Sequence, residues 1–235
     1  MAELTIDGKK VVAYPGETIL QVAKRYGIKI PNLCHHDEVK PYTACRLCLV
    51  EIKKGKRTKI VTSCDYPAEE GLEVKTTNEK IAKSRKMLME LYISRCPNLP
   101  VLQKMAEEMG VGEPRFEKEN EDCILCGLCV RVCSEVVGRY ALGYESRGPE
   151  RRVVPPFDEP NPLCISCGAC AYVCPVDVIP IEEKDGYRIM ERWHKKSKLI
   201  ACEKCGKYFA TEEEIAWLKE KGLPEDKARL CTDCR

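Results

Sequence analysis

The sequence is short of the features that usually assign a function. No run of about 18 apolar residues occurs, so we expect no membrane-spanning helix. The start of the chain has an acidic Glu3 and no apolar stretch of signal-peptide length, which predicts a cytoplasmic protein. Lys and Arg (39) nearly balance Asp and Glu (37), and the net charge of +2 gives no reason to expect nucleic acid as a partner.

Nucleotide and catalytic motifs are absent as well. No G-x-G-x-x-G loop, P-loop or nucleophile elbow occurs, so we expect no nucleotide site and no catalytic residue in this chain. Aromatic residues make up only 6% of the sequence, a thin supply for conventional cores, whereas cysteines number 17. Because thiols stay reduced in the cytoplasm, we expect these cysteines to be metal ligands rather than disulfide partners.

The cysteines form four groups of four, and Cys96 is left over. The groups are Cys34, Cys45, Cys48 and Cys64; Cys123, Cys126, Cys129 and Cys133; Cys164, Cys167, Cys170 and Cys174; and Cys202, Cys205, Cys231 and Cys234.

The two central groups repeat one pattern, C-x2-C-x2-C-x3-C. At this spacing three thiolates surround one corner of an iron–sulfur cubane, and Gly127 and Gly168 allow the chain to turn closely around it. In two-cluster ferredoxins the fourth cysteine ligates the other cluster. Structural zinc is the alternative, but C-x2-C-x2-C suits a tetrahedral ion poorly. We therefore assign one [4Fe–4S] cluster to Cys123, Cys126, Cys129 and Cys174, and a second to Cys164, Cys167, Cys170 and Cys133.

The first group reads Cys34-x10-Cys45-x2-Cys48-x15-Cys64, similar to the plant-type [2Fe–2S] spacing with a longer first gap. We predict a [2Fe–2S] cluster here, with zinc as the alternative. His35 and His36 are expected to be polar neighbours of the cluster rather than ligands, because four cysteines already complete it. Arg46, inside the C-x2-C turn, is either a backbone or cluster partner or a plain surface residue.

Local patterns place this site in a small domain of strands and one helix. Thr18 begins a capping-box helix that ends at Gly27. Strands are expected on both sides of an Asp7-Gly8 turn and later in the domain, over residues 4–6, 10–14, 47–52, 59–62 and 72–75.

Two helices and a loop are expected further along the chain. Helical periodicity covers residues 76–93, with a capping box from Thr76 to Glu79, and a second helix is expected over 99–109. Residues 148–157 contain too much proline for a helix and are expected to form a loop.

The last group pairs Cys202-x2-Cys205 with Cys231-x2-Cys234, which is typical of a tetrahedral zinc site. The pairs are 25 residues apart, and a helix over 211–222, with Thr211 as its cap and Gly222 as its stop, accounts for the long gap. A fourth iron–sulfur cluster is the alternative, since four thiolates would hold it equally well. Because zinc is redox-inert, we expect it to fold or dock a tail too small for a core of its own.

Three stretches resemble a known family. Ile30-Pro-Asn-Leu-Cys34-His35, Ala44-Cys45-Arg-Leu-Cys48-Leu-Val-Glu51 and the double ferredoxin motif look like the N-terminal part of the large iron–sulfur subunit of complex I. They look equally like the diaphorase iron–sulfur subunit of NAD-linked hydrogenases and the N-terminal region of electron-bifurcating hydrogenases. The resemblance covers about residues 3–180.

The resemblance implies an α+β chain. A β-grasp [2Fe–2S] domain is expected over 1–76, a helical connector over 77–117 and a two-[4Fe–4S] ferredoxin domain over 118–185, followed by the zinc-ribbon-like module over 186–235. The family usually has a further His- and Cys-ligated [4Fe–4S] site between its domains. Here only Cys96 remains in that segment, and no histidine occurs between His36 and His194. We interpret Cys96 as a remnant or buried thiol and expect three iron–sulfur clusters.

Three one-electron centres without a substrate motif predict a conductor of electrons. The resemblance implies that the chain is an electron-transfer subunit of an NAD(P)-linked, flavin-containing oxidoreductase, and a hydrogenase is the complex we expect first. Its expected partners are a flavin and NAD(P)-binding subunit, a catalytic hydrogenase-like subunit and, if the complex bifurcates electrons, a soluble ferredoxin. Alternatives are the iron–sulfur subunit of succinate dehydrogenase or fumarate reductase, whose first motif has x4, or of formate dehydrogenase. A free electron carrier or an iron–sulfur sensor is the alternative of another class.

Overall fold

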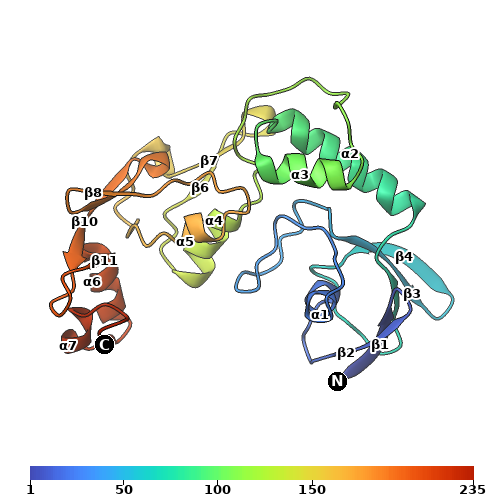
Figure 1. The fold of residues 1–235 in the computed structure, drawn as a ribbon, viewed down its shortest axis with the longest axis horizontal. Coiled ribbons are helices and arrows are strands. Elements are labelled where there is room, and N and C mark those ends of the chain that lie inside the picture. The colour runs from blue at the N-terminus through green and yellow to red at the C-terminus, as the bar shows by residue number, and fades with distance from the viewer. The chain divides into compact units, whose positions relative to one another are not determined.

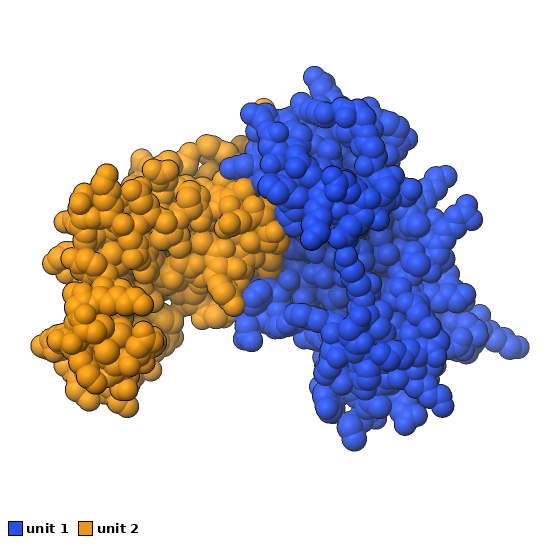
Figure 2. All heavy atoms as spheres, viewed as in Figure 1, with its two compact units in different colours: residues 1–127 blue, residues 128–235 orange.

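The computed structural model describes residues 1–235, which divide into two compact units, Met1–Gly127 and Leu128–Arg235 (Figure 2). No helix of the protein combines the length and the apolar character needed to cross a membrane.

A five-stranded mixed sheet forms the start of the first unit. Its strand order is β2-β1-β5-β3-β4, in which β1 and β5 are parallel and the other neighbours are antiparallel. The strands are β1 (Ala2–Ile6), β2 (Lys9–Ala13), β3 (Leu49–Lys54), β4 (Arg57–Thr62) and β5 (Glu73–Lys75). The expected strands are thus confirmed, with ends that differ by one or two residues, as is usual for strand boundaries.

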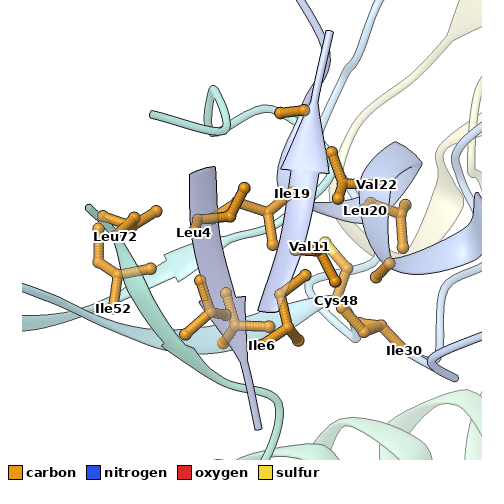
Figure 3. Close-up of a cluster of buried hydrophobic side chains, with 14 of the residues drawn as sticks. Leu4, Ile6, Val11, Ile19, Leu20, Val22, Ile30, Cys48, Ile52 and Leu72 are labelled. Carbon is orange, nitrogen blue, oxygen red and sulfur yellow. The ribbon is translucent and has the colours of Figure 1, made fainter. Parts of the chain in front are cut away.

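Helix α1 (Ile19–Arg25) supplies the apolar layer that covers this sheet. The predicted capping box is confirmed, because the Thr18 hydroxyl accepts the Gln21 N–H and the Gln21 side chain accepts the Thr18 N–H. The helix buries Ile19 and Val22 completely, and Figure 3 shows them beside strand residues such as Leu4 and Val11. Cys48 and Cys64 belong to the same cluster, so two of the four N-terminal cysteines are part of the hydrophobic core.

Helices α2 (Glu79–Arg95) and α3 (Pro100–Glu108) pack against each other after the sheet (Figure 1). The predicted capping box at Thr76 is wrong. The Thr76 N–H and hydroxyl both donate to the Asp7 carboxylate, at 2.8 and 2.6 Å, so Thr76 is held against the β1–β2 turn. Asn78 caps α2 instead, accepting the N–H of Ile81 at 2.8 Å, so the helix begins three residues later than Thr76.

The second unit begins with short elements. Helix α4 (Leu128–Arg131) continues into a π-helical turn, η1 (Val132–Val136), and α5 (Ala169–Tyr172) follows the second cysteine motif. The loop expected over 148–157 is wrong in part. The 3₁₀ turns η2 (Gly148–Glu150) and η3 (Pro156–Asp158) flank β7 (Arg152–Val154), which pairs antiparallel with β6 (Gly143–Glu145). The prolines thus lie in the turns beside the strand and leave its N–H groups free to pair.

The C-terminal part adds a four-stranded antiparallel sheet in the order β11-β10-β9-β8. Its elements are β8 (Glu182–Lys184), β9 (Tyr187–Met190), the 3₁₀ turn η4 (Glu191–Trp193), β10 (Lys195–Ala201), β11 (Tyr208–Thr211), α6 (Glu212–Glu220) and α7 (Glu225–Ala228). Thr211 caps α6 as predicted, accepting the N–H of Glu214. The apolar cluster around α6 buries only Ala210, Ile215 and Ala228, so this part has a very small core of its own.

Candidate iron–sulfur and zinc sites

The four N-terminal cysteines are brought together as two close pairs. The Sγ atoms of Cys48 and Cys64 lie 3.3 Å apart, and the backbone N–H of Cys45 donates to Cys34 Sγ at 3.3 Å. All four cysteines are buried, with at most 2% of each residue exposed. Hydrogen bonding to Cys34 lowers the pKa of the Cys45 thiol, and hydrogen bonding to Cys64 lowers that of Cys48. Two thiol pairs fit a [2Fe–2S] cluster, in which each iron takes two thiolates.

Arg85 holds the loop between two of these ligands, and sequence reasoning did not find it. From helix α2 its Nε donates to the carbonyl of Leu47 at 2.8 Å, and its second terminal nitrogen donates to the carbonyls of Leu49 and Thr76 at 2.6 and 3.0 Å. Burial lowers the pKa of Arg85, although a guanidinium remains charged in proteins. A fixed positive charge therefore lies beside the Cys48 ligand. The polar helix position gave no hint of this contact.

Cys133, Cys164, Cys167 and Cys170 line one small cavity of the second unit. Apolar side chains complete its wall, among them Val137, Leu142, Met190 and Trp193. Two N–H groups point at the sulfurs: the Ala141 amide reaches Cys133 Sγ at 3.3 Å, and the Trp193 indole reaches Cys170 Sγ at 3.4 Å. Four thiols around an apolar pocket fit a cubane, and these are the residues predicted for the second [4Fe–4S] cluster.

The residues predicted for the first [4Fe–4S] cluster are divided between the two units. Cys123 and Cys126 end the first unit, and Cys129 and Cys174 belong to the second. Within the first unit, the Leu125 N–H donates to Cys123 Sγ at 3.4 Å. Joint ligation of one cluster by these four cysteines stays a prediction.

The two cubane motifs share an unusual backbone conformation. Leu125 and Ser166 occupy the same place in the repeat and have φ of +53° and +52°, and Gly127 and Gly168 have φ of +74° and +77°. A left-handed conformation is ordinary for glycine but costs about 1–3 kcal/mol for other residues. The glycines were predicted from the sequence, whereas Leu125 and Ser166 carry no such signal. Arg46, in the N-terminal C-x2-C turn, is also left-handed, at +56°.

The C-terminal cysteines converge more tightly. The four sulfur atoms of Cys202, Cys205, Cys231 and Cys234 all lie within 4.8 Å of one another, and those of Cys205 and Cys231 are 3.7 Å apart. Zinc–thiolate bonds of about 2.3 Å in a tetrahedron place the sulfurs about 3.8 Å apart. A cubane would hold its thiolates further apart, because four irons lie between them. The donor set and spacing therefore fit a single zinc ion.

Cys96, His35 and His36 belong to none of the predicted ligand sets. Cys96 ends helix α2 and is fully buried, and burial raises the pKa of its thiol to about 12. Its lack of a ligand role stays a prediction. His35 and His36 contact their own loop: His35 lies 3.9 Å from Asp37, and His36 Nδ1 accepts the N–H of Glu38.

Comparison with known proteins identifies two kinds of iron–sulfur domain. Residues 1–79 match the 2Fe-2S iron-sulfur cluster binding domain, and residues 163–179 match the 4Fe-4S binding domain. A chain in the crystal structure of an NAD⁺-reducing [NiFe]-hydrogenase in the H₂-reduced state superposes with a TM-score of 0.57. The two are 31% identical, and the match covers 66% of this chain and 74% of that one. The chain belongs to the iron–sulfur subunit family of complex I and NAD-linked hydrogenases.

Other members of this iron–sulfur subunit family are much longer. The NADPH-Fe(3+) oxidoreductase subunit alpha of Geobacter sulfurreducens is 35% identical over 173 residues, which are 63% of this chain and 20% of that protein. The mitochondrial NADH-ubiquinone oxidoreductase 78 kDa subunit of Candida albicans is 30% identical over 178 residues, 64% of this chain and 24% of that protein. This chain thus matches only 20% and 24% of the length of these two relatives.

Proposed function

We propose that the chain is the electron-transfer subunit of an NAD(P)-linked, flavin-containing oxidoreductase, most specifically a hydrogenase. It carries single electrons between a flavin subunit and a catalytic metal subunit. One observation carries the proposal: the chain builds two different kinds of four-cysteine site, the paired N-terminal cysteines and the cavity of the second unit. Similarity to a chain of the NAD⁺-reducing hydrogenase structure supports the choice of complex.

The division of work follows from the chemistry of the carriers. A nicotinamide exchanges a hydride, a two-electron unit, and a flavin can release the pair as single electrons. Iron–sulfur clusters accept electrons one at a time, so they suit the next stage. This chain's residues would hold a [2Fe–2S] cluster at Cys34, Cys45, Cys48 and Cys64 and two [4Fe–4S] clusters at the central cysteines. A soluble ferredoxin as an additional acceptor is compatible with this arrangement.

The C-terminal module has a different task in this proposal. Zinc at Cys202, Cys205, Cys231 and Cys234 would not conduct electrons, but it would stabilise a segment whose own apolar core is very small. The tight sulfur spacing supports zinc over a fourth cluster.

Reduction by pyridine nucleotide tests the proposal. Purified alone under anoxia, the chain should be bleached by dithionite and left oxidised by NADH and NADPH. The complex isolated from its source cells should contain flavin and be bleached by one of the two nucleotides. Bleaching of the isolated chain by a nucleotide would contradict a pure conductor. Elution of the native protein alone, near 26.7 kDa and without flavin, would indicate a free carrier.

A further inference from the structure

The C-terminal part of the chain is hydrogen-bonded to the loop that carries Cys164 and Cys167. The Thr211 hydroxyl donates to the Ile165 carbonyl at 2.7 Å, and the Arg188 guanidinium donates to the Ser166 carbonyl at 2.9 Å. The hydroxyls of Ser166 and Ser197 lie 2.8 Å apart. Ser166, Ser197 and Thr211 are at most 2% exposed, so these bonds are shielded from water. Strands β9, β10 and β11 thus cover the loop between two predicted ligands.

Trp193 extends this cover to a third predicted ligand. It lies in the turn η4 between β9 and β10, is 1% exposed and lines the cysteine cavity beside Met190. Its indole nitrogen, which can only donate, is 3.4 Å from Cys170 Sγ. The guanidinium of Arg192 lies 5.9 Å from the Trp193 ring, and Arg192 also donates to the Val178 carbonyl at 3.0 Å. Arg192 thus lies beside the indole ring and is itself tied to the segment after Cys174.

We infer that residues 188–211 form a cap that sets the reduction potential of the second [4Fe–4S] cluster, with Trp193 as its hydrogen-bond donor to Cys170. The inference rests on the proposed function, because it requires Cys170 to ligate a cluster. It adds a role that packing alone would not give: an indole used only to fill space needs no N–H directed at a ligand sulfur.

The direction of the effect follows from electrostatics. One added electron increases the negative charge on the cluster and its ligand sulfurs. An N–H directed at Cys170 Sγ therefore stabilises the reduced form more than the oxidised form. Hydrogen bonds to cluster sulfurs and solvent exposure are established determinants of these potentials, and a buried bond is stronger than an exposed one. Removal of the indole N–H should make this cluster harder to reduce.

The test uses the full holoprotein, purified under anoxia and titrated with dithionite while reduced clusters are followed by EPR. Trp193→Phe keeps an aromatic ring in the cavity and removes the N–H. We expect one cubane to titrate at a more negative potential, with the other cubane and the [2Fe–2S] signal unchanged. Trp217→Phe is the matched control, since it changes the other of the two tryptophans and should leave all potentials unchanged. A Trp193→Phe protein with full iron content and unmoved potentials would overturn the inference.

A second measurement does not depend on the Trp193 variant. In Trp217→Phe protein labelled with ¹⁵N at the indole, only Trp193 carries the label, and pulsed EPR of the reduced protein should show a ¹⁵N coupling to a cubane. Absence of that coupling would also overturn the inference, even if Trp193→Phe loses its cluster. Iron analysis separates this failure from that of the proposed function: unlabelled wild-type protein lacking cubane iron contradicts the cluster assignment itself.

Discussion

The Nε of Arg85 donates a hydrogen bond to the carbonyl oxygen of Leu47, 38 residues earlier in the chain. Leu47 lies between the predicted ligands Cys45 and Cys48, so a helix of the following segment fixes the loop that holds the [2Fe–2S] site. We expect Arg85→Met to leave three carbonyls, two of them in buried hydrogen bonds, without this donor and to destabilise the domain by roughly 2–4 kcal/mol.

The measurement for Arg85 is the thermal unfolding midpoint of the anoxic holoprotein, read from its visible absorption. Lys83→Met is the control, because Lys83 is an exposed cation of the same helix. Equal midpoints for the two variants would show that Arg85 does not stabilise the cluster loop.

Metal analysis of anoxic protein separates the predicted centres. We expect about ten iron and one zinc per chain, from one [2Fe–2S] cluster, two cubanes and one Cys₄ zinc site. About fourteen iron per chain without zinc would show that the C-terminal site holds a fourth cluster instead of zinc. About two iron per chain would show that the two cubanes are absent.

Cys96 tests the number of clusters. Because Cys96 is the only cysteine between Cys64 and Cys123, and no histidine occurs between His36 and His194, we expect Cys96→Ser and Cys96→Ala to keep their full iron content. A stability loss of about 1 kcal/mol is expected from the altered packing. Loss of about four iron in both variants would identify Cys96 as a ligand of a further cubane.

A Cys174 variant tests whether the last cysteine of each cubane motif ligates the cluster of the other motif. Cys174→Ala should damage the cluster of Cys123, Cys126 and Cys129, giving a [3Fe–4S] EPR signal or loss of that cluster. Electron flow through the complex should fall steeply, whereas nucleotide–flavin exchange on the partner should persist. If that exchange disappears in an assembled complex, this chain is part of the catalytic site.

The Thr211 hydroxyl both caps helix α6 and donates a hydrogen bond to the loop that carries Cys164 and Cys167. Thr211→Val removes the bond to the Ile165 carbonyl and the cap on Glu214, at a cost of about 2 kcal/mol. We expect faster loss of one cubane in air, followed by the decay of visible absorption. Thr211→Ser keeps the hydroxyl and should decay like the wild type. Equal decay of Thr211→Val and wild type would show that the contact does not protect the cluster.

The sequence predicted those features that depend on neighbouring residues. The capping box at Thr18 and the cap at Thr211 are encoded within four residues and are confirmed. Thr76 carries the same local signal, but Asp7 engages its hydroxyl from the other end of the domain. The local pattern fails at Thr76 because contacts with the distant Asp7 fix the position of this residue, and Asn78 accepts the N–H of Ile81 instead.

The ligand sets could be proposed from spacing, but their surroundings could not. Arg85 and Trp193 contact the cysteine sites across 38 and 23 residues, and neither belongs to a motif. The left-handed conformation of Ser166 was equally hidden, since nothing in its residue type requires it. Long-range pairing of this kind is visible only after the chain has folded.

The hydrogen bond between Thr211 and Ile165 joins two segments that are synthesised at different times. Thr211 is made 46 residues after Ile165, and a ribosome adding about 5–20 residues per second needs about 2–9 s for that distance. During this interval the Cys164–Cys170 loop has left the peptidyl-transfer centre before its cover has been synthesised. The contacts of Arg188, Ser197 and Thr211 with this loop therefore form only after its cysteines have been synthesised, so the β9–β11 segment orders a loop whose ligands are already present.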